Sequence, residues 1–422
     1  MVAIGLLDIP PEIHLQIAEF VETRQSLKAL SVTSRSLRSI AQSKLFERLE
    51  IDISTELKGS VDDLLANPRI CAAIRFLGLR GWFSFPDAEP RCSNEENLSL
   101  IQKILPEMVG LREVSIFQVN LSKAFLDAFL GIAANMPLQV ALKWNKYPYS
   151  VIPTPHIPLQ IPQLDFNVTD GHHPSLELFR SMLHASVTTI TGLKITAHGD
   201  GLMKLADINL PFLHDLTLMI CDESIRTSAA AFLTAQRAIR KLKLSGEVRP
   251  FPPIPPNALP NLRELKASTE LVNQLVPGRP VEAIEVRDAR GYDQDWFGEE
   301  VAQSTVRVRK LRVHLSCAEN NETLDTRMVK RMVTILPFLE SLWLPVLPGD
   351  VGDPFARLPC FGGSFPSDSP QFRRSPHLTQ VPQGPSLRSV SSGRAQLQPH
   401  RYQTAECEFI IFISQGSGKR SE

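Results

Sequence analysis

A spaced apolar pattern recurs through the middle of this chain and constrains its fold more than any other feature. In each unit an apolar residue is followed by two others, an apolar residue, one other residue and a third apolar residue. The last two apolar positions alternate, as a short strand with one buried face requires. The nine units begin at Ile74, Leu111, Ile190, Leu213, Ile239, Leu262, Val281, Val308 and Leu339. One unit alone would be weak, but together they predict a repeat architecture.

The distance between units indicates the kind of repeat. From Leu193 to Leu342 the middle apolar positions lie 19 to 31 residues apart. Stretches with helical spacing at 124–134, 224–235 and 326–335 separate the strands. Periods of about 20 to 30 residues with one strand and one helix per unit are typical of β/α solenoids. The units resemble degenerate leucine-rich repeats, without the asparagine ladder and even spacing of strict ones.

Residues 135–175 fit this repeat worst. Strands are predicted at 139–144 and 164–166, and the proline-rich segment 147–162 separates them. We interpret that segment as an irregular loop on the solenoid and as a candidate part of its binding surface.

The first fifty residues predict three short amphipathic helices. Pro10 and Pro11 suit a helix start, and Glu12 suits its positive dipole end. Three apolar groups have helical spacing: Ile13, Ile17, Phe20 and Val21; Leu27, Leu30 and Val32; Leu37, Ile40, Ala41 and Leu45. Such a small module buries little surface alone, so we expect it to dock on a partner. A small helical cap on the solenoid is the alternative.

These residues also resemble a known family over positions 5–49. The similarity lies in Leu7-Asp8-Ile9-Pro10-Pro11-Glu12-Ile13, then Leu27-x-x-Leu30-Ser31-Val32, then Arg35, Arg38 and Lys44-Leu45-Phe46. This pattern resembles the F-box in its fungal form. Two positions depart from it, because Ser36-Leu37 replaces an aromatic residue and Phe46 replaces a closing tryptophan.

The resemblance implies that residues 1–50 bind the Skp-type adaptor of a cullin-RING ubiquitin ligase. The expected adaptor-binding residues are Leu7, Ile9, Pro10, Ile13, Ile17, Leu27 and Leu30. For Ile13 and Ile17, packing in the helical core is an equal alternative to contact with the adaptor.

The last part of the chain, 349–422, loses the repeat. Residues 349–399 are rich in Pro, Ser, Gly, Gln and Arg, and we expect this tail to be disordered because it has little apolar surface to bury. The apolar run 408–413 has two interpretations. It is a short strand or docking segment, or it marks a departure from the natural reading frame.

Composition and motifs narrow the function. The 45 basic and 45 acidic residues balance, which favours neither nucleic acid nor an anionic membrane as partner. Six scattered cysteines form no close Cys/His cluster, so no metal or cofactor is predicted. His172 and His173 with His184 are interpreted as loop histidines. No catalytic motif was found, so no catalytic residue is assigned and the chain is not expected to be an enzyme.

No secretion signal or long apolar segment is apparent, so we expect a cytoplasmic and/or nuclear protein. Exposed members of the four tryptophans, Trp82, Trp144, Trp296 and Trp343, would be candidate anchors for a partner.

The predicted fold class is α+β multidomain. It comprises a three-helix F-box at 1–50, a leucine-rich-repeat-like β/α solenoid at 51–348 and a disordered tail at 349–422. The expected function is the substrate-recognition subunit of an SCF-type (Skp–cullin–F-box) ubiquitin ligase. The alternative is a non-catalytic repeat scaffold whose F-box serves assembly without ubiquitin transfer. The solenoid would bind a protein substrate, whose identity cannot be inferred from the fold.

Overall fold

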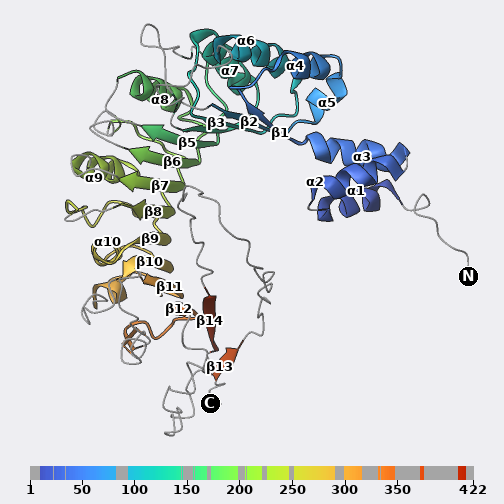
Figure 1. The fold of residues 1–422 in the computed structure, drawn as a ribbon. Helices are drawn as coiled ribbons and strands as arrows, with labels where there is room; N and C mark the ends of the chain where they lie inside the picture. Colours follow the sequence, from blue (N-terminus) through green and yellow to red (C-terminus); the bar gives the residue numbers. More distant parts are fainter. Residues whose placement is uncertain are drawn as a thin grey trace, which may run out of the picture. The chain divides into compact units, whose positions relative to one another are not determined.

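The chain divides into two units, Met1–Leu262 and Arg263–Glu422, and each contains part of the strand repeat (Figure 1). The structure is a computed structural model. It describes residues 10–21, 23–33, 35–81, 94–143, 145, 155, 157–168, 173–197, 205, 207–220, 226–246, 251–289, 299–315, 331–332, 334–346, 371–374 and 407–414.

The first unit begins with three helices, which confirms the predicted helical stretch. They are α1 (Pro11–Phe20), α2 (Arg24–Thr33) and α3 (Arg35–Phe46). Pro10 is the N-cap of α1 and Pro11 lies in its first turn, where a missing N–H has no cost. Thr23 caps α2, because its Oγ1 accepts a 3.1 Å hydrogen bond from the Ser26 amide.

A parallel sheet follows in the same unit. Its strands are β1 (Arg48–Asp52), β2 (Phe76–Arg80), β3 (Glu113–Phe117), β4 (Gln139–Lys143), β5 (Gln163–Val168), β6 (Gly192–Ala197), β7 (Asp215–Ile220) and β8 (Lys241–Ser245). Each strand pairs in parallel with the next one along the chain. The repeat pattern predicted β2, β3, β6, β7 and β8 and their parallel arrangement, whereas β1 was not predicted. The expected strands at 139–144 and 164–166 are confirmed as β4 and β5.

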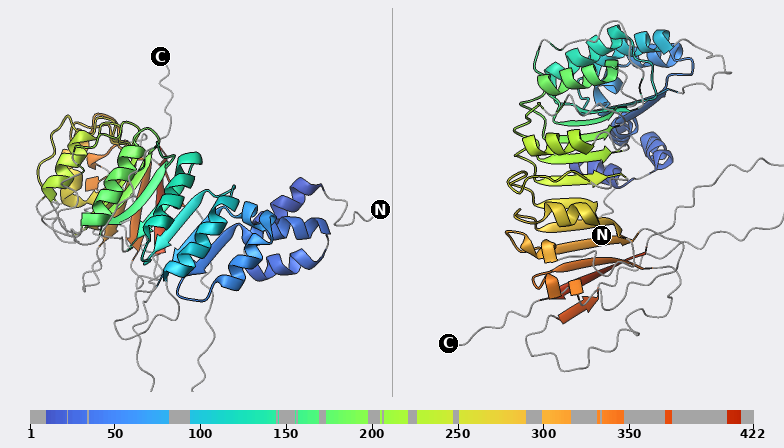
Figure 2. Two further views of the ribbon diagram at one scale, coloured as in Figure 1. Left: turned by 90° about the horizontal axis from the view of Figure 1, so that it is seen from above. Right: turned by 90° about the vertical axis from the view of Figure 1, so that its left-hand side faces the viewer.

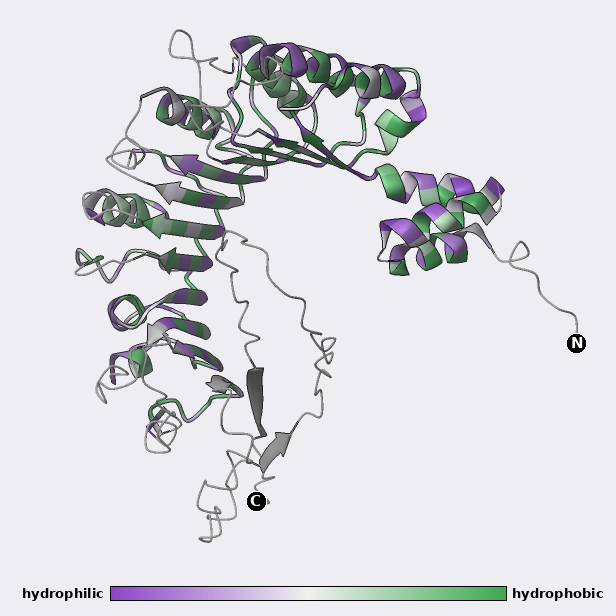
Figure 3. Cartoon of the chain, viewed as in Figure 1, coloured by the Kyte–Doolittle hydropathy of each residue, from purple (hydrophilic) through white to green (hydrophobic). Residues whose placement is uncertain are grey.

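Helices join these strands and cover one face of the sheet, as Figures 1 and 2 both show. They are α4 (Lys58–Leu65), α5 (Pro68–Ala73), α6 (Asn94–Ile104), α7 (Lys123–Asn135), α8 (His173–Ala185) and α9 (Arg226–Ala235). The predicted helices at 124–134 and 224–235 correspond to α7 and α9. The strands alternate hydrophobic and hydrophilic residues along their length (Figure 3). The hydrophobic set is buried, and the other set lies on what we call the open face.

Three buried amide side chains connect one repeat to another in place of a regular asparagine ladder. Asn97 donates to the carbonyls of Ile53 and Thr55 at 2.8 and 2.9 Å. Asn145 and Gln236 each donate to one backbone carbonyl and accept from one backbone amide in the preceding repeat. Since an unpaired buried backbone group costs about 1–3 kcal/mol, these amides fix how neighbouring repeats stack.

The proline-rich segment 147–162 lies largely outside the described residues, which include only 155 and 157–162 of it. Its end is part of the repeat core, because Leu159 and Ile161 are buried. The Leu138 amide also donates to the Gln160 carbonyl at 2.9 Å. The idea that the rest of the segment belongs to a binding surface stays a prediction.

The second unit repeats the same organisation. Its elements are β9 (Glu264–Ser268), α10 (Thr269–Leu275), β10 (Ala283–Ala289), a short 3-10 helix (Glu299–Gln303), β11 (Lys310–Leu315), β12 (Ser341–Val346), β13 (Gln371–Arg374) and β14 (Cys407–Ser414). Strands β9 to β12 pair in parallel in chain order. Of the helix predicted at 326–335, residues 331–332 and 334–335 are described and helical.

Only β13 and β14 are described in the tail that the sequence predicts to be disordered. β14 pairs antiparallel with β12, with Ser341 opposite Phe412 and Val346 opposite Cys407. Of the two interpretations of the apolar run 408–413, the structure shows the strand. Because β14 covers the edge that β12 would otherwise leave open, it ends the parallel array.

Candidate functional site

The three N-terminal helices carry apolar side chains that their own packing leaves exposed. Ile13 and Phe20 on α1 are 41% and 85% exposed, and Leu15 on α1 and Val32 on α2 are also exposed. We call these four residues the helical surface. Four large apolar residues exposed on so small a module are an unusual amount of apolar surface for a free protein.

The core beneath this surface is small. It consists mainly of Ala18, Leu27, Leu37 and Ala41, with His14 also buried. α1 and α2 both pack on α3, and Arg38 Nε on α3 donates to the Ser31 carbonyl of α2 at 3.1 Å. Two of the four core residues are alanines, so little apolar area holds the helices together.

The structure separates the expected adaptor-binding residues into three groups. Ile13 and Pro10 are exposed, whereas Ile17 and Leu30 are half-buried. Leu27 is 9% exposed and belongs to the core of the three helices, so its side chain is closed to a partner. Leu7 and Ile9 lie outside the described residues.

Sequence analysis did not select Leu15, Phe20 and Val32 as contact residues. Phe20 had a usable signal, because it shares the helical spacing of Ile13 and Ile17. Leu15 had none, since it lies off that stripe.

The open face of the first unit is polar and nearly balanced in charge. On β5 the Asp165 Oδ2 lies 2.8 Å from Lys143 Nζ on β4 and 3.0 Å from Lys194 Nζ on β6. On the first two strands Glu50 pairs with Arg48 and Arg80 at 3.0 and 3.1 Å. Asp165 therefore links cations on the two neighbouring strands, and Glu50 links one cation on its own strand with one on β2.

The open face of the second unit carries a denser cluster. Lys266, Glu285, Arg312 and Trp343 lie side by side on β9, β10, β11 and β12. Glu285 forms an ion pair with Lys266, and its Oε1 lies 2.9 Å from His314 Nε2. We call Lys266, Glu285, Arg287, Arg312, His314 and Trp343 the basic cluster.

The cations around Glu285 govern its ionisation. Burial alone would raise the pKa of this carboxyl, but Lys266, His314 and Arg312 outweigh that effect and hold the pKa below its ordinary value. Glu285 therefore stays ionised at neutral pH and fixes the positions of the surrounding cations.

The basic cluster was also missed in the sequence, although a signal was present. Four of its residues occupy the same position in successive repeat units, namely the one residue between the last two apolar residues of the unit. They follow Leu265, Ile284, Leu311 and Leu342. Aligning the units and comparing that position would have brought Lys266, Glu285, Arg312 and Trp343 together.

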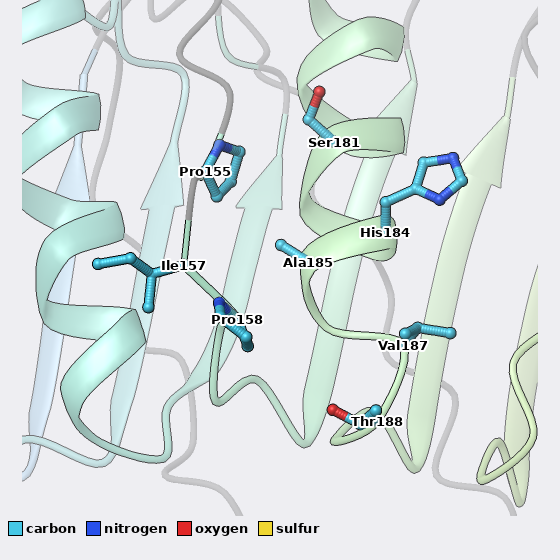
Figure 4. Close-up of a pocket in the computed structure, with 8 residues that line it drawn as sticks. All are labelled: Pro155, Ile157, Pro158, Ser181, His184, Ala185, Val187 and Thr188. Atoms are coloured by element: carbon cyan, nitrogen blue, oxygen red, sulfur yellow. The ribbon is translucent and has the colours of Figure 1, made fainter.

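A cavity of about 450 Å³ lies at the C-terminal end of α8 (Figure 4). Its lining is mainly apolar, from Ile157, Pro158, Ala185 and Val187, and His184 is its one ionisable residue. A pocket with so few polar groups can accept an apolar side chain but offers no constellation for catalysis.

The described residues offer neither a metal site nor an activated thiol. No group of three or more His, Cys, Asp or Glu residues there could hold a metal ion. The Cys71 thiol is buried, and burial, with a smaller contribution from Glu107, raises its pKa. A thiol of this kind is a poor nucleophile. Among the helices described, none has the length and apolar character needed to cross a membrane.

Comparison with known proteins adds no family to these observations. No family model matches the chain, and no curated protein matches it.

Proposed function

We propose that this chain is an F-box protein that acts as the substrate-recognition subunit of an SCF-type ubiquitin ligase. In this proposal α1 to α3 bind the Skp-type adaptor, and the leucine-rich-repeat-like sheet binds a protein substrate. Other subunits carry out ubiquitin transfer, so the role requires no catalytic group in this chain.

The helical surface is the observation that carries the proposal. Ile13, Leu15, Phe20 and Val32 are exposed beside a core that contains two alanines and two leucines. Fully burying one such side chain contributes about 1.5–3 kcal/mol, so a partner that covers several of them binds tightly. The F-box resemblance spans the same helices and supplies the class of partner.

The mechanism is tethering. A substrate held by the sheet and an adaptor held by the helices belong to one assembly, so the charged ubiquitin-conjugating enzyme meets the substrate at a raised effective concentration. Such a subunit raises the rate of ubiquitin transfer to its substrate without contributing a reacting group.

Co-purification of the full chain with the Skp-type adaptor tests the proposal. Ile13→Asp places a charge on the helical surface, where burial without a partner costs several kcal/mol, and should abolish the complex. Gln42→Asp is the matched control, because it adds the same charge at an exposed polar position of α3. It should leave the complex intact. Loss of binding in both variants, or in neither, would contradict the assignment of the surface.

Ubiquitin transfer needs its own measurement. Proteins bound to the sheet should accumulate when cullin neddylation is blocked. When the chain carries Ile13→Asp, their turnover should already be lost, so blocking neddylation should cause no further rise. If the adaptor binds but the bound proteins keep the same turnover, the chain is a scaffold and the ligase function is wrong.

A further inference from the structure

We propose that the open face of β9 to β12 binds an acidic segment of a partner protein, with Lys266, Arg287 and Arg312 contacting its carboxylates and Trp343 packing against an adjacent apolar side chain. The inference builds on the proposed function by naming the chemical class of the substrate segment.

The charge on this face favours an anionic partner. Among the side chains described on β9 to β12, Lys266, Arg287, Lys310 and Arg312 point outward together with two carboxylates, Glu264 and Glu285. Across the described strands of the first unit, basic and acidic residues on the open face are nearly equal, so the excess is local to this cluster.

The basic cluster is also organised before any ligand binds. Lys266 and His314 are paired with Glu285, and Arg287 Nε lies 3.7 Å from the same oxygen. The side chains of Lys266 and Arg287 are 25% and 34% exposed, so each has one side on the protein and one side open. A cation already held in position loses less conformational entropy on binding, which strengthens the contact.

At the β12 edge of the basic cluster, the Trp343 ring offers an apolar contact. Arg312 Cζ lies 4.7 Å from the centre of the Trp343 ring, and the indole N–H donates to Ser341 Oγ at 2.6 Å. Ser268 lies opposite Arg287 on the neighbouring strand, and its buried Oγ has no hydrogen-bond partner among the described residues.

These features favour a protein over a nucleic acid. The whole chain has equal numbers of basic and acidic residues, and Glu285 in the centre of the cluster would repel a continuous phosphate backbone. A peptide can place separate carboxylates over separate cations and an apolar side chain on Trp343. Aromatic residues of this kind are frequent anchors in protein interfaces.

The experiment is fluorescence anisotropy with the full chain. The probe is a short labelled peptide of glutamates separated by glycines, with one central leucine. The wild-type chain should bind it, and binding should weaken as salt screens the charges. Arg312→Gln and Arg287→Gln should each weaken binding about tenfold. The same peptide with glutamine in place of glutamate should not bind.

Arg309→Gln is the matched control. Arg309 precedes β11, is more than half exposed and pairs with Glu340 outside the basic cluster. Its loss removes the same charge and should leave affinity unchanged within about twofold. Circular dichroism on each variant confirms that the sheet is retained, and two separate cluster variants guard against one failing to fold.

Three results would overturn the inference: no binding of the glutamate peptide at low salt, equal weakening by Arg309→Gln, or tighter binding of a single-stranded oligonucleotide of equal charge. Adaptor binding is measured on the same samples. Peptide binding without adaptor binding would refute the proposed ligase function and support the acidic-segment site. Adaptor binding without peptide binding would refute the acidic-segment site and support the proposed ligase function.

Discussion

The three N-terminal helices and the sheet of the first unit differ in how completely they bury their apolar side chains. Each central strand buries its alternating apolar residues almost completely, as Leu216 and Leu218 show on β7. The helices bury Leu27 and Leu37 but leave Phe20 85% exposed. The sheet thus buries its apolar residues through the stacking of its own repeats, whereas the helices leave several of theirs exposed.

Because of this difference in burial, the helices and the sheet favour two different kinds of protein interface. The helices display apolar side chains and so favour a stable, largely hydrophobic interface. The open face of the sheet displays charged side chains held by ion pairs, which favours recognition through charge and steering. In the function proposed above, one chain would therefore hold the adaptor stably and select a substrate by its charge.

The largest expected effect on stability comes from placing the same charge on the buried face and then on the open face of β7. Leu216→Asp buries a charge in the repeat core, and the free energy of unfolding should fall by several kcal/mol. Met219→Asp adds the same charge on the open face of the same strand, where the side chain is exposed, and should change stability by no more than about 0.5 kcal/mol. Urea unfolding followed by circular dichroism measures both. Equal destabilisation would mean that the open face is covered.

A second pair of variants compares a buried with an exposed apolar side chain within the helices. Leu37→Ala removes a buried side chain and should destabilise the helices by about 2–5 kcal/mol. Phe20→Ala should have little effect on their stability, since this side chain touches little in the free protein. Amide hydrogen exchange in residues 11–46 reports local stability directly. Faster exchange in Phe20→Ala than in Leu37→Ala would show that Phe20 belongs to the core.

The smallest effect concerns pH. The pKa of Glu285 is held below the ordinary glutamate value of about 4.3, so its ion pairs stabilise the fold above that pH. This stabilisation should disappear as the pH falls through the lowered pKa. Glu285→Gln should flatten the acid dependence of urea unfolding. Glu282→Gln, at a more exposed carboxylate paired with Arg263, should keep the wild-type dependence. No difference between the variants would contradict the assigned role of Glu285.

The strands could be predicted from the sequence because a parallel repeat uses the same spacing each time. The pattern also occurs at Phe46, Leu49 and Ile51 and at Ile161, Leu164 and Phe166, which belong to β1 and β5 or precede them directly. Both were missed as repeat units, the first because those residues had been assigned to the helical module. Helices α4, α5, α6 and α8 were not predicted. Packing on the sheet stabilises α4 and α5, which are short. α8 has 13 residues, and its buried Leu176, Phe179 and Leu183 have helical spacing, so a usable signal was present there.

The candidate sites were less predictable. Helical spacing shows which residues share a face, but it does not show which face meets another helix. On α1 the packing face contains Ala18 and His14, because a small residue lets two helices approach closely, and the larger Ile13 and Phe20 are turned outward. The basic cluster depends on the register between strands from distant parts of the chain. Such a register follows only once the repeat units are aligned.

The central claim is that adaptor binding resides in the helices and is independent of the sheet. Titration calorimetry of the purified adaptor with the full chain, Ile17→Asp, Phe20→Ala and Leu216→Asp tests it most directly. We predict that Ile17→Asp abolishes binding, that Phe20→Ala weakens it by at least about tenfold, and that Leu216→Asp binds as the wild type does. Loss of adaptor binding in Leu216→Asp as complete as in Ile17→Asp would contradict the claim.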